Sequence, residues 1–215
     1  FIAWVLAPLA ATAAIVCSIQ AIFEKEVRRM LAFSSVAQVG FILLGLSLAT
    51  SAGFSGAMLY LLAHALLKMT LFMAIGALAL SRRFRKLDDI AGIARDAPWS
   101  AAALAVGAAS LAGAPLTIGF LAKWRLIEAA LQGGQVWIAV VLAIASLLTL
   151  LYVGRIIEAV FFRPAPAGAP RAKEAPFGVL APLFVIAGLC IWFGVDATLP
   201  EQLANGAARA LMGAP

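Results

Sequence analysis

His64 and Lys68 are the first residues that could do chemistry, because both ionise and both lie in a strongly apolar stretch. The only histidine of the chain stands four residues before Lys68 in YLLAHALLKMTLF, residues 60–72. Residues spaced four apart share one face of a helix, so Tyr60, His64 and Lys68 should form a stripe. An imidazole and an amine that exchange protons near neutral pH predict a relay through water. The alternative is static, with the histidine bound to a backbone carbonyl and the lysine to a carboxylate.

Lys123 is the second candidate, because it follows an interruption in a long apolar segment. A straight helix over 98–132 would reach about 52 Å, whereas the hydrocarbon core of a bilayer is about 30 Å thick. Gly113 and Pro115 interrupt this segment in LAGAPLTIGF. Because proline has no N–H, the carbonyl four residues before it loses its partner, and we expect two half-helices joined by an unwound turn. Such ends bind ions in transporters, which places Lys123 at a functional position inside the bilayer. A simple proline kink facing lipid is the alternative.

Other polar residues could extend a hydrated path, or could hold neighbouring helices together. We expect Arg125 to reach the outer headgroups and to pair with Glu128, three residues further along the same helix face. The accessory candidates are Tyr60, Arg28, Ser34, Ser35, Gln38 and Glu128.

Composition places the chain in a membrane. Of its 215 residues 64% are apolar and only 12% are charged, and the mean hydropathy is +1.04. Soluble domains carry about 25% charged residues. Segments of roughly 20 apolar residues predict spanning helices, and therefore an all-α integral membrane fold. The predicted spans are about 2–22, 30–50, 54–80, 98–132, 136–162 and 176–196.

The basic residues predict the orientation. Eleven of the 16 lie in alternate loops, which are therefore expected to be cytoplasmic, with both termini external. They are Lys25, Arg28, Arg29, Arg82, Arg83, Arg85, Lys86, Arg95, Arg163, Arg171 and Lys173. This distribution argues against a nucleic-acid partner. We expect a repeat of five spans over 1–163, a Pro-rich cytoplasmic loop over 164–175, and a final span with an external tail over 176–215.

Enzyme sites are not evident in the sequence. One histidine and no clustered cysteines argue against a zinc site, and Cys17 and Cys190 lie inside predicted spans as small apolar residues. Phosphate-binding glycine loops and nucleophile motifs are also absent. We therefore expect no cofactor, no metal and no catalytic residues, and favour a transporter subunit.

Three ordered motifs resemble one family of membrane proteins. They are EKEVRRMLAFSSVAQVGF (24–41), YLLAHALLKMTLFMAIGAL (60–78) and LAGAPLTIGFLAKWRLI (111–127). Each resembles the proton-conducting antiporter-like subunits: the L, M and N subunits of respiratory complex I, related hydrogenase subunits, and the A and D subunits of Mrp cation/proton antiporters. GFLAKW and LLTLLYVGRIIEAVFFRP look most like the D-type subunits of the Mrp antiporters.

The resemblance implies a fold and roles for particular residues. Members have fourteen helices with two inverted five-helix repeats, and this chain corresponds to the second repeat and the final helix. Lys123 matches the titratable residue on the second broken helix, and His64 and Lys68 match the helix that links two half-channels. Arg28 stands where members often have lysine, and arginine does not release its proton. Tyr60 stands where some have histidine.

The first repeat, with its glutamate–lysine pair, is not in this sequence, which opens with Phe1 in apolar residues. We expect a fragment of a longer chain, or a first half encoded separately. The predicted function is proton translocation within a multisubunit monovalent cation/proton antiporter of the bacterial inner membrane. Its expected partners are lipid, other subunits, H⁺, and Na⁺ or K⁺. Alternatives are a non-redox, proton-pumping subunit of a complex-I-like NADH:quinone oxidoreductase or hydrogenase, and a structural scaffold with static buried ion pairs.

Overall fold

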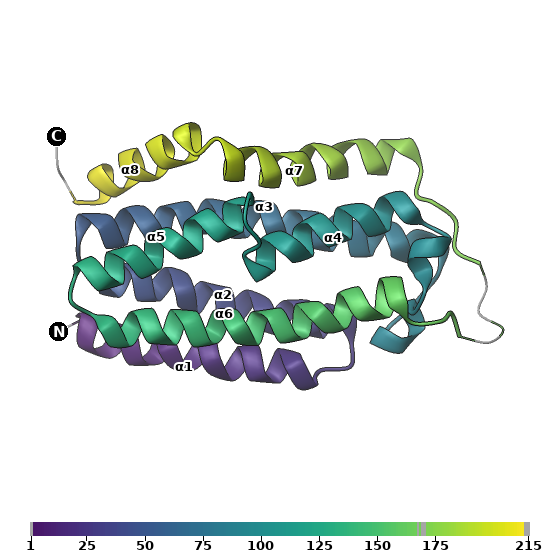
Figure 1. The fold of residues 1–215 in the computed structure, drawn as a ribbon, viewed down its shortest axis with the longest axis horizontal. Helices are drawn as coiled ribbons and strands as arrows, with labels where there is room; N and C mark the ends of the chain where they lie inside the picture. Colours follow the sequence, from purple (N-terminus) through teal and green to yellow (C-terminus); the bar gives the residue numbers. More distant parts are fainter. Residues whose placement is uncertain (1, 167, 169–170, 213–215) are drawn as a thin grey trace.

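The computed structural model describes residues 2–166, 168 and 171–212, which form a bundle of nearly aligned helices (Figure 1). The α-helices are α1 (Ile2–Phe23), α2 (Val27–Ser47), α3 (Ser51–Ser81), α4 (Pro98–Ala112), α5 (Ile118–Gln132), α6 (Val136–Ile157), α7 (Phe177–Val195) and α8 (Thr198–Met212). A π-helical turn, η3 (Glu158–Phe162), extends α6, and two 3₁₀ turns, η1 (Leu87–Ile90) and η2 (Ile93–Arg95), precede α4.

Five helices in the described part are long and apolar enough to cross a membrane: α1, α2, α3, α6 with its extension, and α7. The remaining predicted span is α4 and α5, which lie end to end (Figure 1). Each has 15 residues and is therefore about 22 Å long. The predicted all-α membrane fold with a broken fourth segment is confirmed.

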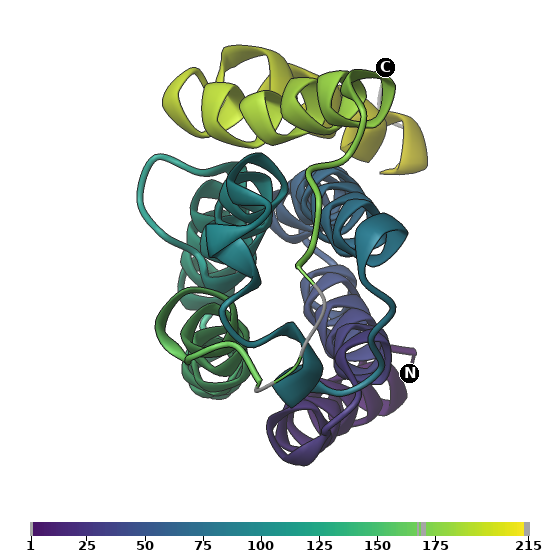
Figure 2. The same ribbon diagram turned by 90° about the vertical axis from the view of Figure 1, so that its right-hand side faces the viewer.

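The two ends of the bundle differ in the length of their connecting segments. The short turns 48–50 and 133–135 lie at one end, named here the hairpin end, where α1 begins and α8 ends (Figure 1). The longer linker 82–97 and the described residues of 163–176 lie at the opposite end, named the loop end. Seen along the helices, α7 and α8 form a layer over α3, α4 and α5 (Figure 2).

The break between α4 and α5 is built by small residues. Gly113 ends α4 with a φ of 87°, a left-handed conformation that glycine adopts without steric cost. Thr117 begins α5 by accepting a hydrogen bond from the Phe120 N–H. Gly119 packs directly on the backbone of α4, and Gly194 of α7 packs on the backbone of the connecting turn. Part of the break is therefore covered by protein, whereas Pro115 and Leu116 are exposed.

The first half-helix is capped from the Pro-rich loop. The Glu174 carboxylate accepts hydrogen bonds from the backbone N–H groups of Trp99 and Ser100 at 2.8 and 3.3 Å, and from the Ser100 hydroxyl. These N–H groups have no partner within the helix, and the negative charge also suits the helix dipole.

Glu174→Ala should therefore destabilise the protein by about 1 kcal/mol, because it removes this cap. The thermal midpoint of the purified protein in detergent measures the effect. Lys173→Ala is the matched control, because its exposed side chain leaves the cap intact. Equal midpoints for the two variants would mean that the cap contributes nothing.

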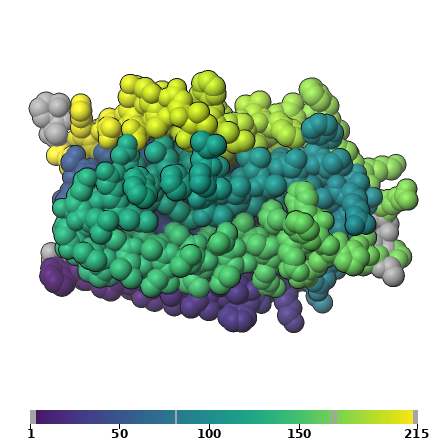
Figure 3. Space-filling view, viewed as in Figure 1, coloured from purple at the N-terminus to yellow at the C-terminus, as the bar shows by residue number. Residues whose placement is uncertain are grey.

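The predicted tail contains a helix that was not expected. Pro200, Ala204 and Ala208 recur every four residues on α8 and are buried against the bundle. α8 contacts α3, and together with α7 it covers one edge of the molecule (Figure 3). The four-residue spacing of small residues was the available signal for this helix.

Candidate functional site

Lys68 of α3 is buried, with 6% of its surface exposed, and it is held by neutral oxygens. Its Nζ donates to the Leu31 carbonyl of α2 at 3.0 Å and to the Ser34 hydroxyl on the same helix. Among the described residues, no carboxylate forms an ion pair with this amine. The static alternative of a lysine paired with a carboxylate is therefore not what this structure contains.

Lys123 of α5 lies at the break and is also 6% exposed. Its Nζ donates to the carbonyls of Leu111 and Ala112, the last residues of α4, at 2.9 and 3.2 Å. Leu111 is the residue four before Pro115, so the lysine binds the carbonyl that proline was predicted to leave unpaired. The negative end of the α4 dipole also favours a cation here.

A hub of neutral polar groups connects three helices between the two amines. The Tyr60 hydroxyl of α3 donates to the Gln38 side-chain carbonyl of α2. The Gln38 amide donates to the Tyr152 hydroxyl at 3.3 Å and to the Thr149 hydroxyl at 3.4 Å, both on α6. Tyr152 is also a hydrogen-bond neighbour of Ser34.

These polar groups are in contact with both lysines, with Lys68 directly and with Lys123 through an aromatic ring. At one end, Ser34 binds Lys68. At the other, the Tyr60 ring stacks on Phe41, with 5.3 Å between ring centroids. The Lys123 Nζ lies 5.6 Å from the centroid of the Phe41 ring, within cation–π range. The two amines are thus the ends of one chain of polar and aromatic groups.

Thr149 and Tyr152 are the members of this chain that sequence reasoning missed. They lie three residues apart in LLTLLYVGR, within a span that otherwise reads as apolar. Both are completely buried. Their spacing put two hydroxyls on one helix face, which was the only available signal.

His64 lies on the same helix as Tyr60 and Lys68 but is not bonded to the chain of polar groups. Its side chain is half-buried, and its Nδ1 has no hydrogen-bond partner among the described residues. Tyr60 and Lys68 both bind α2, as residues of one stripe should, but His64 bonds to neither of them.

The remaining accessory candidates lie outside the chain of polar groups. Ser35 donates only to the Leu31 carbonyl of its own helix, and Arg28 is exposed near the loop end. Glu128 forms the predicted ion pair with Arg125, at 2.9 Å. Arg125 also pairs with Glu201 of α8, at 2.5 Å.

Fold and site together define a class: a multi-pass membrane protein with a broken helix and two buried, neutrally bound lysines. Residues 1–149 match the family described as NADH:quinone oxidoreductase/Mrp antiporter, TM. The chain belongs to this family.

Curated relatives include subunit N of two oxidoreductases. NADH-quinone oxidoreductase subunit N of Desulforudis audaxviator is 38% identical over 194 residues, which cover 85% of this chain and 39% of the relative. F(420)H(2) dehydrogenase subunit N of Methanosarcina mazei is 33% identical over 184 residues, covering 81% and 37%. The chain therefore spans about two fifths of the length of these relatives.

Solved structures show the same fold. The Mrp complex from Dietzia sp. contains a chain with a TM-score of 0.91 and 29% identity, covering 97% of this chain and 47% of that one. The archaeal membrane-bound sulfane sulfur reductase gives 0.87 and 29%, covering 96% and 42%. Respiratory complex I from Thermus thermophilus, at 21% identity and a TM-score of 0.80, shares the fold and covers 98% and 45%.

Proposed function

We propose that this chain moves protons across the membrane as part of a multisubunit monovalent cation/proton antiporter. The observation that carries the proposal is the pair of buried amines, Lys68 and Lys123, each bound by neutral oxygens, with one chain of polar and aromatic groups between them. An amine without a carboxylate partner has no fixed counter-charge to hold its proton. Each lysine can therefore take up and release a proton.

The polar chain gives the two amines a route of communication. Ser34, Tyr152, Gln38 and Tyr60 provide hydroxyl and amide groups that can hand protons on, with water completing the gaps. A charge on one lysine disfavours a charge on the other, so loading one end promotes release at the other. His64, one helical turn from Lys68 and with an Nδ1 that has no partner among the described residues, is a further member of the proposed water-linked path.

The distribution of ion pairs supports transport over a static scaffold. The salt bridges of the described residues involve Arg29, Arg85, Arg125 and Arg163, all with side chains about one third exposed or more. The buried amines take no part in them. A scaffold that kept buried charges for structure would pair them with carboxylates, because a buried charge without a counter-charge is costly.

Two kinds of driving force fit this module. The similarity to a chain of the Mrp complex supports exchange of H⁺ for Na⁺ or K⁺, and the similarity to subunit N of oxidoreductases supports a redox-driven pump. In either case we propose other membrane subunits as partners, the bacterial inner membrane as location, and the basic loop end as the cytoplasmic side.

The test measures proton movement in inside-out vesicles that carry the full-length protein in its native assembly. Lys68→Ala should lower the initial rate of the internal pH change at least about 100-fold, as loss of a proton-transfer group does. Lys25→Ala, an exposed lysine at the loop end, should keep the full rate. Internal alkalinisation on addition of Na⁺ or K⁺, as the entering cation is exchanged for protons that leave, would support the antiporter. Internal acidification on addition of NADH would support the redox-driven pump. Full transport by Lys68→Ala would remove it from the mechanism.

A further inference from the structure

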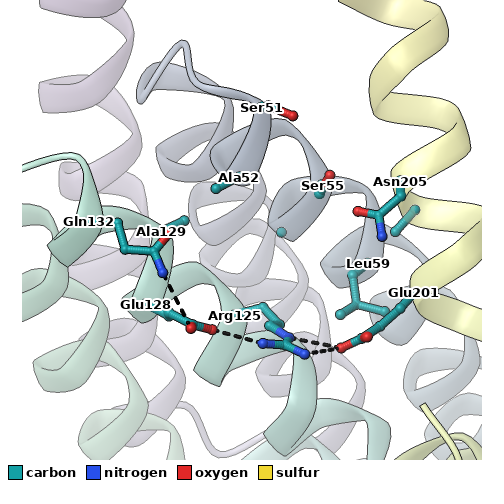
Figure 4. A pocket seen from close by; sticks show the side chains of 12 residues that line it. Ser51, Ala52, Ser55, Leu59, Arg125, Glu128, Ala129, Gln132, Glu201 and Asn205 are labelled. Atoms are coloured by element: carbon teal, nitrogen blue, oxygen red, sulfur yellow. Dashed lines mark hydrogen bonds and ion pairs between the residues drawn. The ribbon is translucent and has the colours of Figure 1, made fainter. Parts of the chain in front are cut away.

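A cavity of about 450 Å³ lies at the hairpin end, where α3 begins and α5 ends (Figure 4). Its rim includes the exposed Ser51 and Gln132, the terminal residues of these two helices. Its deeper wall includes Gly56, which is buried. The cavity therefore leads from the end of the bundle towards the interior.

The cavity carries a net negative charge and is walled by α8. Arg125 lies between two carboxylates, 2.9 Å from Glu128 on its own helix and 2.5 Å from Glu201 on α8 (Figure 4). Two carboxylates and one guanidinium leave one negative charge, which attracts cations and hydronium.

Lys123 lies in a layer near the inner end of this cavity, because Leu59 and Arg125 of the cavity wall are one residue from Tyr60 and two residues from Lys123 along their helices. The layer contains Lys123 of α5, Phe41 of α2 and Tyr60 of α3, which contact one another in sequence. One helical turn further towards the hairpin end, the same three helices contribute Leu126, Gly45 and Gly56. Gly56 of this second layer belongs to the cavity wall, whereas Leu126 and Gly45 do not line the cavity.

Leu126 fills a notch made by the two glycines of the second layer. A Cβ atom added to Gly45 would lie 2.5 Å from a Leu126 methyl carbon, and one added to Gly56 would lie 3.1 Å from it. Leu126 is completely buried. Because Gly56 also lines the cavity, the leucine side chain lies behind this part of the cavity wall, and Lys123 is three residues away on the same face of α5.

We propose that this cavity is the outer mouth of the proton path of Lys123, and that Leu126 is the apolar gate between them. The inference rests on the proposed function and adds the access route and its barrier. While Leu126 fills the notch, water in the cavity does not reach Lys123. When its side chain leaves the notch, the space beside the two glycines admits water, and the amine exchanges its proton with the outer solution.

Thiol labelling tests the water-filled mouth without measuring transport. Cys17→Ser and Cys190→Ala remove the two thiols of this sequence, and Ser55→Cys places one on the cavity wall. A membrane-impermeant, positively charged thiol reagent should label this variant, in its native assembly, from the hairpin side only. Ala57→Cys, two residues along α3 and completely buried, is the matched control and should stay unlabelled. If the Ser55→Cys variant stayed unlabelled, the proposal that the cavity is a water-filled mouth would be wrong.

The proton leak of energised vesicles tests the gate. Leu126→Ala should raise the passive leak about tenfold, because an unfilled notch shifts the gate towards its hydrated state. Leu131→Ala is the control, because this leucine of the same helix is 52% exposed and faces away from the notch. Leu126→Met keeps the side-chain volume and should assemble normally, with a smaller increase in leak.

An unchanged proton leak in both Leu126 variants would show that Leu126 is not the gate. This outcome is distinguishable from failure of the proposed function. Labelling of Ser55→Cys does not depend on transport, whereas the proposed function fails only if the buried lysines prove dispensable.

Discussion

Lys123→Ala is expected to abolish proton translocation while leaving the subunit assembled. The alanine side chain cannot bind a proton, so the polar chain loses its terminal group at the break. We expect the transport rate to fall at least about 100-fold, the usual effect of removing a proton-transfer group. The rate of pH-gradient formation in vesicles measures the loss, and the amount of assembled complex in the same membranes shows whether the variant folds.

Lys123→Arg tests whether the residue at this position must release a proton or only carry a positive charge. Arginine can still donate to the carbonyls of Leu111 and Ala112, which now bind Lys123, and it keeps the positive charge at the end of α4. It does not release its proton at physiological pH. We therefore expect a folded but inactive protein, and full transport by either Lys123 variant would exclude this residue from the proton path.

Gly119→Ala is expected to destabilise the protein by about 3 kcal/mol, the upper part of the range for overpacking. A Cβ atom at this position would lie 1.8 Å from the Ser110 carbonyl oxygen, a backbone atom of α4 that cannot rotate away. The two half-helices would have to separate, which also moves the carbonyls that hold Lys123. A lowered thermal midpoint in detergent, together with loss of transport, is the expected result.

Gly188→Ala provides the comparison for this steric effect. Gly188 lies within α7, and an added Cβ atom there meets nothing within 4 Å. Since alanine favours helix over glycine, this variant should be as stable as the original protein or slightly more stable. Equal midpoints for Gly119→Ala and Gly188→Ala would mean that the half-helices do not depend on their close contact.

The framework of the molecule could be predicted from the sequence, because it depends on local properties. The length of an apolar segment decides whether it can span a membrane, and a proline decides where a helix loses a hydrogen bond, whatever the neighbouring helices are. The broken segment around Pro115 and the burial of Lys68 and Lys123 follow from such rules. The unpaired carbonyl of Leu111 was predictable too, but not that Lys123 would bind it.

Contacts between distant segments were decided only by the tertiary structure. Gln38 meets Thr149 and Tyr152 because α2 packs beside α6, and Leu126 finds its notch because two glycines from different helices face it. His64 shares a helix with Lys68, yet the packing leaves it without a bond to that amine. Periodicity determines which residues share a helix face, but the partner of that face depends on how all the helices assemble, and no local pattern in the sequence specifies it.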